Sequence, residues 1–234
     1  MALLEWLVNG TIPVGSSFLS VPEALGNVFG LTSAILGMRR WVLAWPIGLL
    51  GNALLFFVFT TGSIADVAEQ PLWGQAGRQV FFGAVSLYGW WRWSSQRGTS
   101  RGVTSAAIEP RWATWGERAL LVGVGAAAYA IAWVVLGQIG SWSPPTEAWI
   151  IAGSMLATWG MARGWVEFWL VWILVDVVGV VSLVRSPYPA HATVGMYLFY
   201  AFFVVMGFFV WWRAARLTQP STTGASSESV EATA

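Results

Sequence analysis

The chain contains two copies of one sequence pattern, and this repeat constrains the fold more than any other feature. Residues 37–52 match residues 161–176 at a constant offset of 124 positions, and a glutamate upstream matches at the same offset. The matched pairs are Glu23 with Glu147, Arg39 with Arg163, Trp41 with Trp165, Val42 with Val166, Trp45 with Trp169, and Asn52 with Asp176. An internal repeat in a membrane protein usually indicates a transporter whose substrate site lies between the copies.

The composition places this repeat in a membrane. The 234 residues are 56% hydrophobic and 10% charged, whereas soluble domains carry about 25% charged residues. Apolar stretches of about 20 residues can cross a hydrocarbon core of about 30 Å. We expect seven helices, at residues 22–38, 41–60, 75–93, 119–140, 147–162, 164–184 and 192–212. A single linker helix between two three-helix units leaves the units in parallel orientation. The sequence therefore predicts an all-α integral membrane protein with a 3+1+3 arrangement.

The same pattern predicts the division of the chain. We expect an interfacial segment at residues 1–18, which has no basic region typical of a signal peptide. A first three-helix bundle follows at 19–93, then a cytoplasmic loop and linker helix at 94–146, and a second bundle at 147–213. Residues 214–234 are rich in Ser, Thr, Ala and Glu, which indicates a disordered cytoplasmic tail.

The arginines predict the orientation in a bacterial plasma membrane. All 12 basic residues are Arg, and in the seven-helix arrangement only Arg78 and Arg185 fall on the side opposite the others. Positively charged loops remain in the cytoplasm, so we expect the N-terminus outside and the C-terminus inside.

The expected sixth helix carries the strongest candidate for a binding site. Trp165, Trp169, Trp172 and Asp176 are spaced to lie on one helical stripe, and Glu167 is the other charged residue of this segment. A charged group at the bilayer centre costs about 2.5–3.5 kcal/mol on insertion scales, so Asp176 must face the bundle interior or a water-filled cavity. The pattern favours a substrate acceptor beside an aromatic wall. A structural Asp between packed helices is the alternative.

The first copy of the repeat offers a complementary surface. Trp45, Gly48 and Asn52 occupy the matching stripe, and Gly48 stands where the second copy has Trp172. If the two helices face each other, the missing side chain opens a slot in which a flat heteroaromatic ring could stack on Trp172 or Trp169.

Other polar residues extend this candidate site. Gln79, Tyr88 and Thr158 are uncharged polar candidates on the two bundles. Glu23 and Glu147 lie at expected helix starts, where a carboxylate complements the helix dipole. A gating role is the alternative for these two glutamates.

No residue grouping indicates an enzyme, a metal site or a cofactor. The chain has no cysteine, which excludes disulfides, thiol catalysis and cysteine-ligated metals. It shows no Ser/His/Asp grouping and no phosphate-binding loop, so ATP-driven transport and a nucleic-acid partner are not expected. The sole histidine, His191, falls in an expected outer loop, away from any proton path.

Several motifs resemble the Pnu-type vitamin transporters over about residues 20–213. They are Trp45-Pro46-x-Gly48 with Asn52, Gln79 with Tyr88-Gly89-Trp90, Glu167-Phe168-Trp169-x-x-Trp172, and Gly207-x-x-x-Trp211 echoing Gly89-x-x-x-Trp93. The resemblance implies a fold similar to full-length SWEET sugar transporters. It also implies facilitated diffusion of nicotinamide riboside, thiamine or riboflavin, with trapping by cytoplasmic phosphorylation.

Residues 162–169 and 174–180 look most like the actinobacterial riboflavin branch of that family. Asp176 and Thr158 depart from the nicotinamide riboside pattern, which has Asn and Gln at these positions. The resemblance therefore implies a riboflavin uniporter that works with a cytoplasmic flavokinase, in contact with membrane lipid and assembled as a homotrimer. The alternatives are a nicotinamide riboside or thiamine uniporter, and a substrate-binding membrane subunit of an energised uptake complex.

Overall fold

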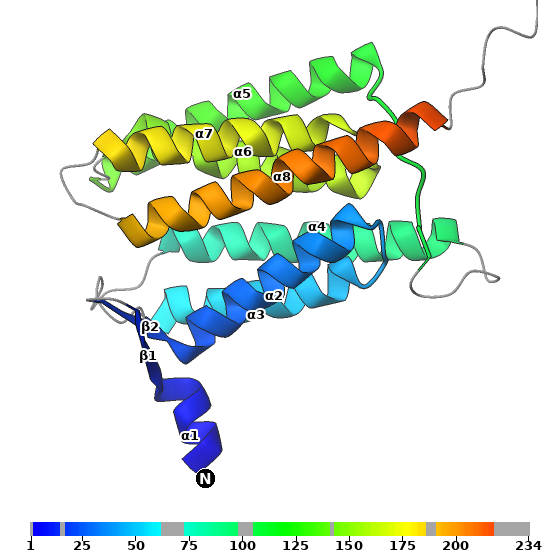
Figure 1. Ribbon diagram of the computed structural model, residues 1–234. Helices are drawn as coiled ribbons and strands as arrows, with labels where there is room; N and C mark the ends of the chain where they lie inside the picture. Colours follow the sequence, from blue (N-terminus) through cyan, green and yellow to red (C-terminus); the bar gives the residue numbers. More distant parts are fainter. Residues whose placement is uncertain are drawn as a thin grey trace, which may run out of the picture.

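The computed structural model describes residues 2–14, 17–61, 73–97, 105–140, 143–185 and 191–217. These residues form helices and one two-stranded antiparallel sheet (Figure 1). The elements are α1 (Ala2–Asn9), β1 (Thr11–Val14), β2 (Ser17–Ser20), α2 (Val21–Met38), α3 (Ala44–Thr61), α4 (Trp73–Arg97), α5 (Trp115–Gln138), α6 (Pro144–Arg163), α7 (Glu167–Arg185) and α8 (His191–Leu217).

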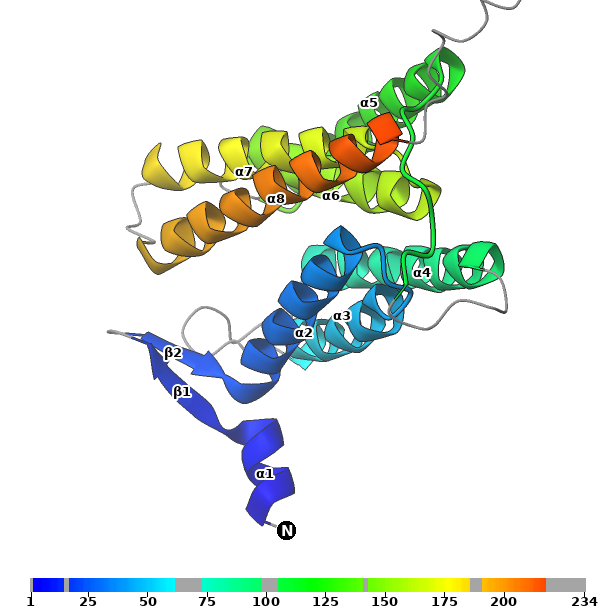
Figure 2. The ribbon, with the colours of Figure 1, turned by 45° about the vertical axis from the view of Figure 1, so that its right-hand side comes forward.

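The long helices form two groups that lie side by side (Figures 1 and 2). Helix α3 packs against both α2 and α4, and α7 packs against both α6 and α8, while α5 packs on α6. The groups meet where α4 packs on α6 and where α2 contacts α8. In both contacts the last helix of one group touches the first helix of the other, as expected for a duplicated unit.

Among the described residues, three helices are long and apolar enough to cross a membrane, as judged by length and composition. They are α3, α5 and the Tyr200–Leu217 part of α8. Helix α5 is the most exposed of them, and large apolar side chains cover its outer surface. These include Leu120, Val122, Val124, Ile131, Trp133 and Val134. Such an apolar surface is suited to contact with lipid. The backbone of the helix is suited to it as well, because a helix satisfies its own backbone hydrogen bonds.

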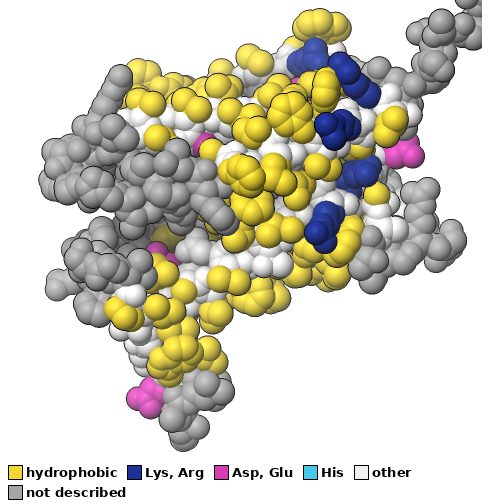
Figure 3. Space-filling view, in the orientation of Figure 1, with side chains coloured by type: hydrophobic (Ala, Val, Ile, Leu, Met, Phe, Trp, Pro, Cys, Tyr) yellow, Lys and Arg dark blue, Asp and Glu magenta, His cyan; other side chains and the backbone are white. Residues whose placement is uncertain are grey.

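Basic side chains gather at one end of the bundle (Figure 3). This is the end at which α2, α4, α6 and α8 finish, and we call it the arginine-rich end. Among the described arginines, Arg39 and Arg216 each lie over a tryptophan ring, with 5.3 Å and 3.8 Å from the guanidinium carbon to the ring centroid. Arginine and aromatic side chains are both favoured at membrane interfaces.

Local sequence explains where the helices begin. Ser20 caps α2 by accepting a hydrogen bond from the Glu23 backbone N–H at 3.3 Å, and Glu23 and Glu147 lie in the first turns of α2 and α6. This confirms that both glutamates mark helix starts. Helix α3 begins at Ala44, so Pro46 lies in its first turn, where proline removes no intrahelical hydrogen bond.

The structure differs from the sequence predictions at three places. Residues 2–14 and 17–20 form a short helix and a hairpin, which the apolar pattern did not predict. Gly164 ends α6 in the left-handed conformation with φ 78°, so α7 begins at Glu167 and Trp165 lies in the turn, off the stripe expected on the sixth helix. His191 is the first residue of α8 and not part of a loop.

Candidate functional site

A cavity of about 340 Å³ lies between the two helical groups. Helices α2, α3 and α4 line it on one side, and α6, α7 and α8 line it on the other. Its wall combines aromatic rings with buried polar side chains, among them Gln79, Ser86, Ser154 and Asp176. Apolar walls with a few polar groups are typical of small-molecule sites.

Eight of the nine candidate site residues line this cavity. They are Trp45, Gly48, Asn52, Gln79, Thr158, Trp169, Trp172 and Asp176. The ninth, Tyr88, stacks on Trp159 with 5.0 Å between ring centroids. Tyr88 therefore joins α4 to α6 beside the cavity, and we do not count it among the cavity residues.

The polar side chains of the cavity keep acceptor atoms free. The Asn52 amide donates to the Ser86 hydroxyl at 3.4 Å. The Ser154 and Thr158 hydroxyls donate to carbonyls of their own helix, at 2.6 Å and 2.8 Å. A hydroxyl that donates to the backbone still has oxygen lone pairs, so these residues can accept from a ligand.

Asp176 is buried at 6% exposure, and its Oδ2 atom has no hydrogen-bond partner in the described structure. A structural Asp between packed helices would be expected to have satisfied oxygens, because buried polar atoms are almost always paired. Asp176 also lines the cavity, and an unpaired acceptor on a cavity-lining residue favours a role beyond packing between helices.

The surroundings of Gly48 do not match the expected slot. A Cβ atom built on Gly48 would lie 2.8 Å from the Ser33 hydroxyl, which itself donates to the Ala44 carbonyl at 2.7 Å. Because the side chain of α2 occupies this space, Gly48 permits close packing of α2 on α3 and does not open a slot beside Trp172.

Two cavity tryptophans rest on glycines in equivalent places. Trp45 lies against Gly89 of α4, where a Cβ atom would be 2.5 Å from the indole, and Trp169 covers Gly207 of α8 in the same way. These glycines are the first residues of the two Gly-x-x-x-Trp motifs. The motif therefore has a packing function that its sequence alone did not disclose.

The tryptophans that end these motifs join the two halves. The Trp93 indole donates to the Ala162 carbonyl at 3.3 Å, and the Trp211 indole donates to the Met38 carbonyl at 3.1 Å. Met38 and Ala162 are themselves 124 positions apart and lie in the last turns of α2 and α6. The same hydrogen bond is thus made twice, once in each direction across the interface.

A segment between α4 and α5 crosses the arginine-rich end of the bundle. Residues 105–113, which we call the strap, run along this end from one helical group to the other (Figures 1 and 2). The Ala107 N–H donates to the Arg40 carbonyl at 2.8 Å, and Arg111 pairs with the 164–166 turn through bonds of 3.0 Å and 2.9 Å. The strap thus binds both of the repeat-equivalent turns.

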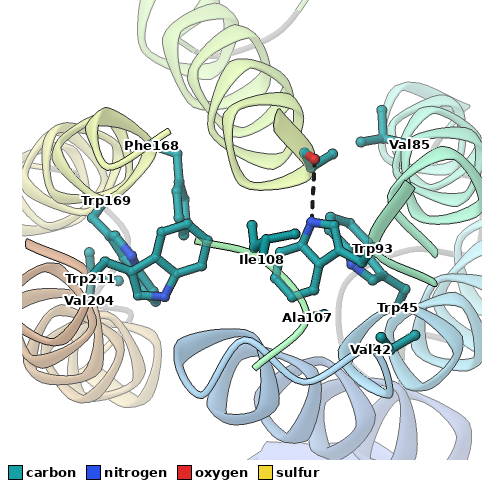
Figure 4. Packing of buried hydrophobic residues seen from close by; sticks show 11 residues of the cluster. Val42, Trp45, Val85, Trp93, Ala107, Ile108, Phe168, Trp169, Val204 and Trp211 are labelled. Carbon is teal, nitrogen blue, oxygen red and sulfur yellow. Dashed lines mark hydrogen bonds between the residues drawn. The ribbon is translucent and has the colours of Figure 1, made fainter. Parts of the chain in front are cut away.

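The side chains of the strap complete a buried cluster (Figure 4). Ala107 and Ile108 lie between a group containing Phe168 and Trp169 and another containing Trp45. Since those three aromatic residues also line the cavity, the cluster forms its floor. The sequence pattern predicted only a loop here, and the apolar pair Ala107-Ile108 is the one local signal of its burial.

Ion pairs secure the strap. The Glu167 carboxylate accepts from the Ala113 N–H at 3.0 Å and from Arg118 at 2.7 Å. Glu117 pairs with Arg111 at 2.6 Å, and its hydrogen bonds raise the pKa of Arg111. Glu167, the first residue of α7, therefore holds the strap in place and is not a carboxylate within the membrane span.

Comparison with known proteins identifies relatives over nearly the whole chain. The model of the nicotinamide mononucleotide transporter family matches residues 20–213. The chain is 33% identical over 226 residues to the riboflavin/roseoflavin transporter RibM of Streptomyces davaonensis, covering 95% of this chain and 99% of that protein. It is 25% identical over 234 residues to the nicotinamide riboside transporter PnuC of Escherichia coli, covering 90% and 92%.

The fold also matches a solved structure, the crystal structure of the vitamin B3 transporter PnuC. The TM-score is 0.64 at 16% identity, and the match covers 85% of this chain and 83% of that one. These matches confirm the resemblance seen in the tryptophan and glycine motifs. The chain belongs to the nicotinamide mononucleotide transporter family.

Proposed function

We propose that the protein imports riboflavin across the bacterial plasma membrane by facilitated diffusion. The observation that carries this proposal is the cavity between the two repeats, which Asp176, a buried carboxylate with an unpaired oxygen, lines together with Trp172. The wall thus offers an acceptor and an aromatic surface to one ligand. The similarity to a riboflavin/roseoflavin transporter supports this substrate.

Riboflavin fits the chemistry of these residues. Its ring carries an imide N–H and its ribityl chain carries hydroxyls, all of which can donate to Asp176. The free hydroxyl lone pairs of Ser154 and Thr158 and the amide of Asn52 suit a polyhydroxyl chain. The tricyclic ring can stack on Trp172.

In this proposal the chain spans the membrane seven times as two parallel three-helix units joined by α5. The units are residues 19–93 and 147–213. The arginine-rich end faces the cytoplasm, which leaves the N-terminus outside and the 214–234 tail inside. The strap then closes the cytoplasmic end of the cavity. A cytoplasmic flavokinase that phosphorylates the vitamin would make the import directional.

Nicotinamide riboside is the second candidate substrate. It carries a fixed positive charge that the buried carboxylate of Asp176 would attract, and a nicotinamide riboside transporter is among the relatives. Thr158 is smaller than the Gln of the nicotinamide riboside pattern and leaves more room for a larger ring. That difference favours riboflavin.

Binding to the purified, full-length protein tests the choice of substrate. Riboflavin is titrated and detected by quenching of its fluorescence, and nicotinamide riboside and thiamine are then added as competitors. We expect saturable quenching that neither competitor reverses at tenfold excess. Failure of riboflavin to bind would refute the proposal, and displacement by nicotinamide riboside would favour the second candidate.

A further inference from the structure

The strap binds the two halves of the bundle unequally, although the turns that it binds are equivalent in the repeat. We call α2–α4 the first half and α6–α8 the second half. Arg40 and Gly164 occupy the same repeat position, and both have a left-handed backbone, with φ of 63° and 78°. The Ala107 N–H of the strap donates to the Arg40 carbonyl at 2.8 Å. The Arg111 N–H donates to the Gly164 carbonyl at 3.0 Å, so both attachments begin with the same kind of hydrogen bond.

The second turn adds bonds that the first turn does not make. The Val166 N–H donates back to the Arg111 carbonyl at 2.9 Å, and among the described residues its repeat equivalent, Val42, makes no such bond to the strap. The Glu167 carboxylate also accepts from the strap backbone at 3.0 Å. The equivalent position of the first turn is Leu43, whose side chain cannot accept a hydrogen bond. The repeat therefore provides this anchor in the second half alone.

The ion pairs show the same asymmetry. Arg39 and Arg163 are repeat equivalents, and each lies over an equivalent tryptophan ring, with 5.3 Å and 5.6 Å from the guanidinium carbon to the ring centroid. Arg163 also pairs with Glu117 at 3.2 Å, and Glu117 holds Arg111 of the strap through two bonds of 2.6 Å and 2.7 Å. Arg39 makes no ion pair within the described part of the chain. Hydrogen bonds between ionised groups are the stronger kind, so the strap is held more firmly on the second half.

Contacts toward the first half can part more easily. Ala107 and Ile108 are 2% and 7% exposed and lie between the aromatic residues of the two halves (Figure 4). Such apolar contacts are non-directional, so they can separate and form again without breaking an ion pair. Glu109 of the strap attracts Arg40 over a longer distance, and no ion pair joins them among the described residues. Helix α5, which follows the strap, packs on α6 of the second half.

We propose that the strap is a fixed part of the second half, and that opening of the arginine-rich end separates it from the first half at the Arg40 carbonyl. The moving body then comprises the strap, α5 and the second half, so the two sides of the transporter are unequal in spite of the repeat. Glu117 and Glu167 hold the strap on the second half during this movement. The inference rests on the proposed transport function and specifies where the bundle parts.

Two pairs of cysteines test the inference, because the chain has no cysteine of its own. Arg40→Cys with Ala107→Cys allows the strap to be linked to the first half. Ala113→Cys with Glu167→Cys allows it to be linked to the second half and is the matched control. A short bis-methanethiosulfonate reagent links each pair in the full-length protein, and a reductant releases it. Riboflavin counterflow in proteoliposomes is measured in the linked and released states.

We expect linkage of the strap to the first half to stop counterflow, and the reductant to restore it. The control pair should transport at the same rate in both states. Counterflow that continues when the first pair is linked would refute the inference. Loss of counterflow on linkage of the control pair would also refute it, because the strap would then have to leave the second half.

Amide hydrogen exchange on the wild-type protein gives a second test that needs neither a variant nor transport. The Ala107 N–H and the Arg111 N–H donate to equivalent carbonyls, so each serves as the reference for the other. We expect the Ala107 N–H to exchange at least about tenfold faster, because its bond breaks whenever the bundle opens. Equal rates, or slower exchange at Ala107, would refute the inference. Wild-type protein that shows this difference in exchange but no riboflavin counterflow would refute the proposed function and leave the asymmetric strap standing.

Discussion

At the residue scale, substrate recognition depends on which buried polar atoms already have partners. Asn52, Ser154 and Thr158 are paired within the protein, whereas Oδ2 of Asp176 is not. A buried group that a ligand completes gives more discrimination than one that is already satisfied, because the wrong ligand leaves it unpaired. Asp176 should therefore contribute strongly to binding.

Asp176→Asn should weaken riboflavin binding by about 1.5–3 kcal/mol, the usual range for a hydrogen bond to a charged group. The reason is that an amide oxygen accepts less strongly and its NH₂ adds a donor facing the ligand. The Kd is measured by flavin fluorescence quenching, with Glu5→Gln, an exposed carboxylate of α1, as the control. Wild-type affinity of a folded Asp176→Asn protein would mean that the carboxylate has only a structural role.

Trp172→Ala should weaken riboflavin binding about 5- to 150-fold, because stacking on an aromatic side chain contributes about 1–3 kcal/mol. The same quenching titration measures it. Trp91→Ala removes an indole that is 65% exposed and should have no effect on the Kd. If both variants bind equally well, Trp172 is a packing residue and the ring lies elsewhere.

At the scale of elements, the repeat predicted more of the structure than the sequence of any single helix did. Two stripes, one with Trp45 on α3 and one with Asp176 on α7, follow from local periodicity, and the structure places both on the cavity. Glu23 and Glu147 lie in the first turns of their helices, as expected. What could not be predicted depends on contacts distant in sequence. Tyr88 does not line the cavity, because it stacks on Trp159 of another helix. The strap could not be predicted from hydrophobic periodicity, because its conformation depends on hydrogen bonds to the two turns that it bridges.

The indole hydrogen bonds of Trp93 and Trp211 across the interface lead to a prediction about how often the cavity opens. Trp93→Phe removes the indole donor to the Ala162 carbonyl, and Trp211→Phe removes the donor shared by the Gly37 and Met38 carbonyls. Each loss is worth about 0.5–1.5 kcal/mol. The double variant should therefore open more often at the arginine-rich end. The chain has no cysteine, so a single Thr158→Cys substitution in the cavity can report on this opening.

Labelling of the introduced thiol by a small membrane-impermeant reagent, added from the cytoplasmic side of inverted vesicles, measures the opening. We expect the rate to rise by at least about fivefold in the double variant. Trp115→Phe, at an indole that is 82% exposed, should leave the labelling rate unchanged. A rate that stays the same or falls in the double variant would show that these bonds do not hold the closed end.

At the scale of the whole molecule, two equivalent helical groups line a common cavity, and the described residues tie them together at the arginine-rich end. This arrangement suits alternating access, in which one repeat unit moves against the other around a fixed site. The described charged groups provide little for ion coupling. Glu167 is engaged by the strap, and Asp176 is assigned to the substrate. The account therefore predicts transport that needs no ion gradient and no partner chain.

Counterflow in proteoliposomes that contain only this protein tests that claim most directly. Vesicles are loaded with unlabelled riboflavin and diluted into labelled riboflavin, with ionophores present to dissipate the proton and sodium gradients. The account predicts transient accumulation of label at the same initial rate with and without the ionophores. Accumulation that disappears when the gradients are dissipated, or that never occurs with this chain alone, would contradict it.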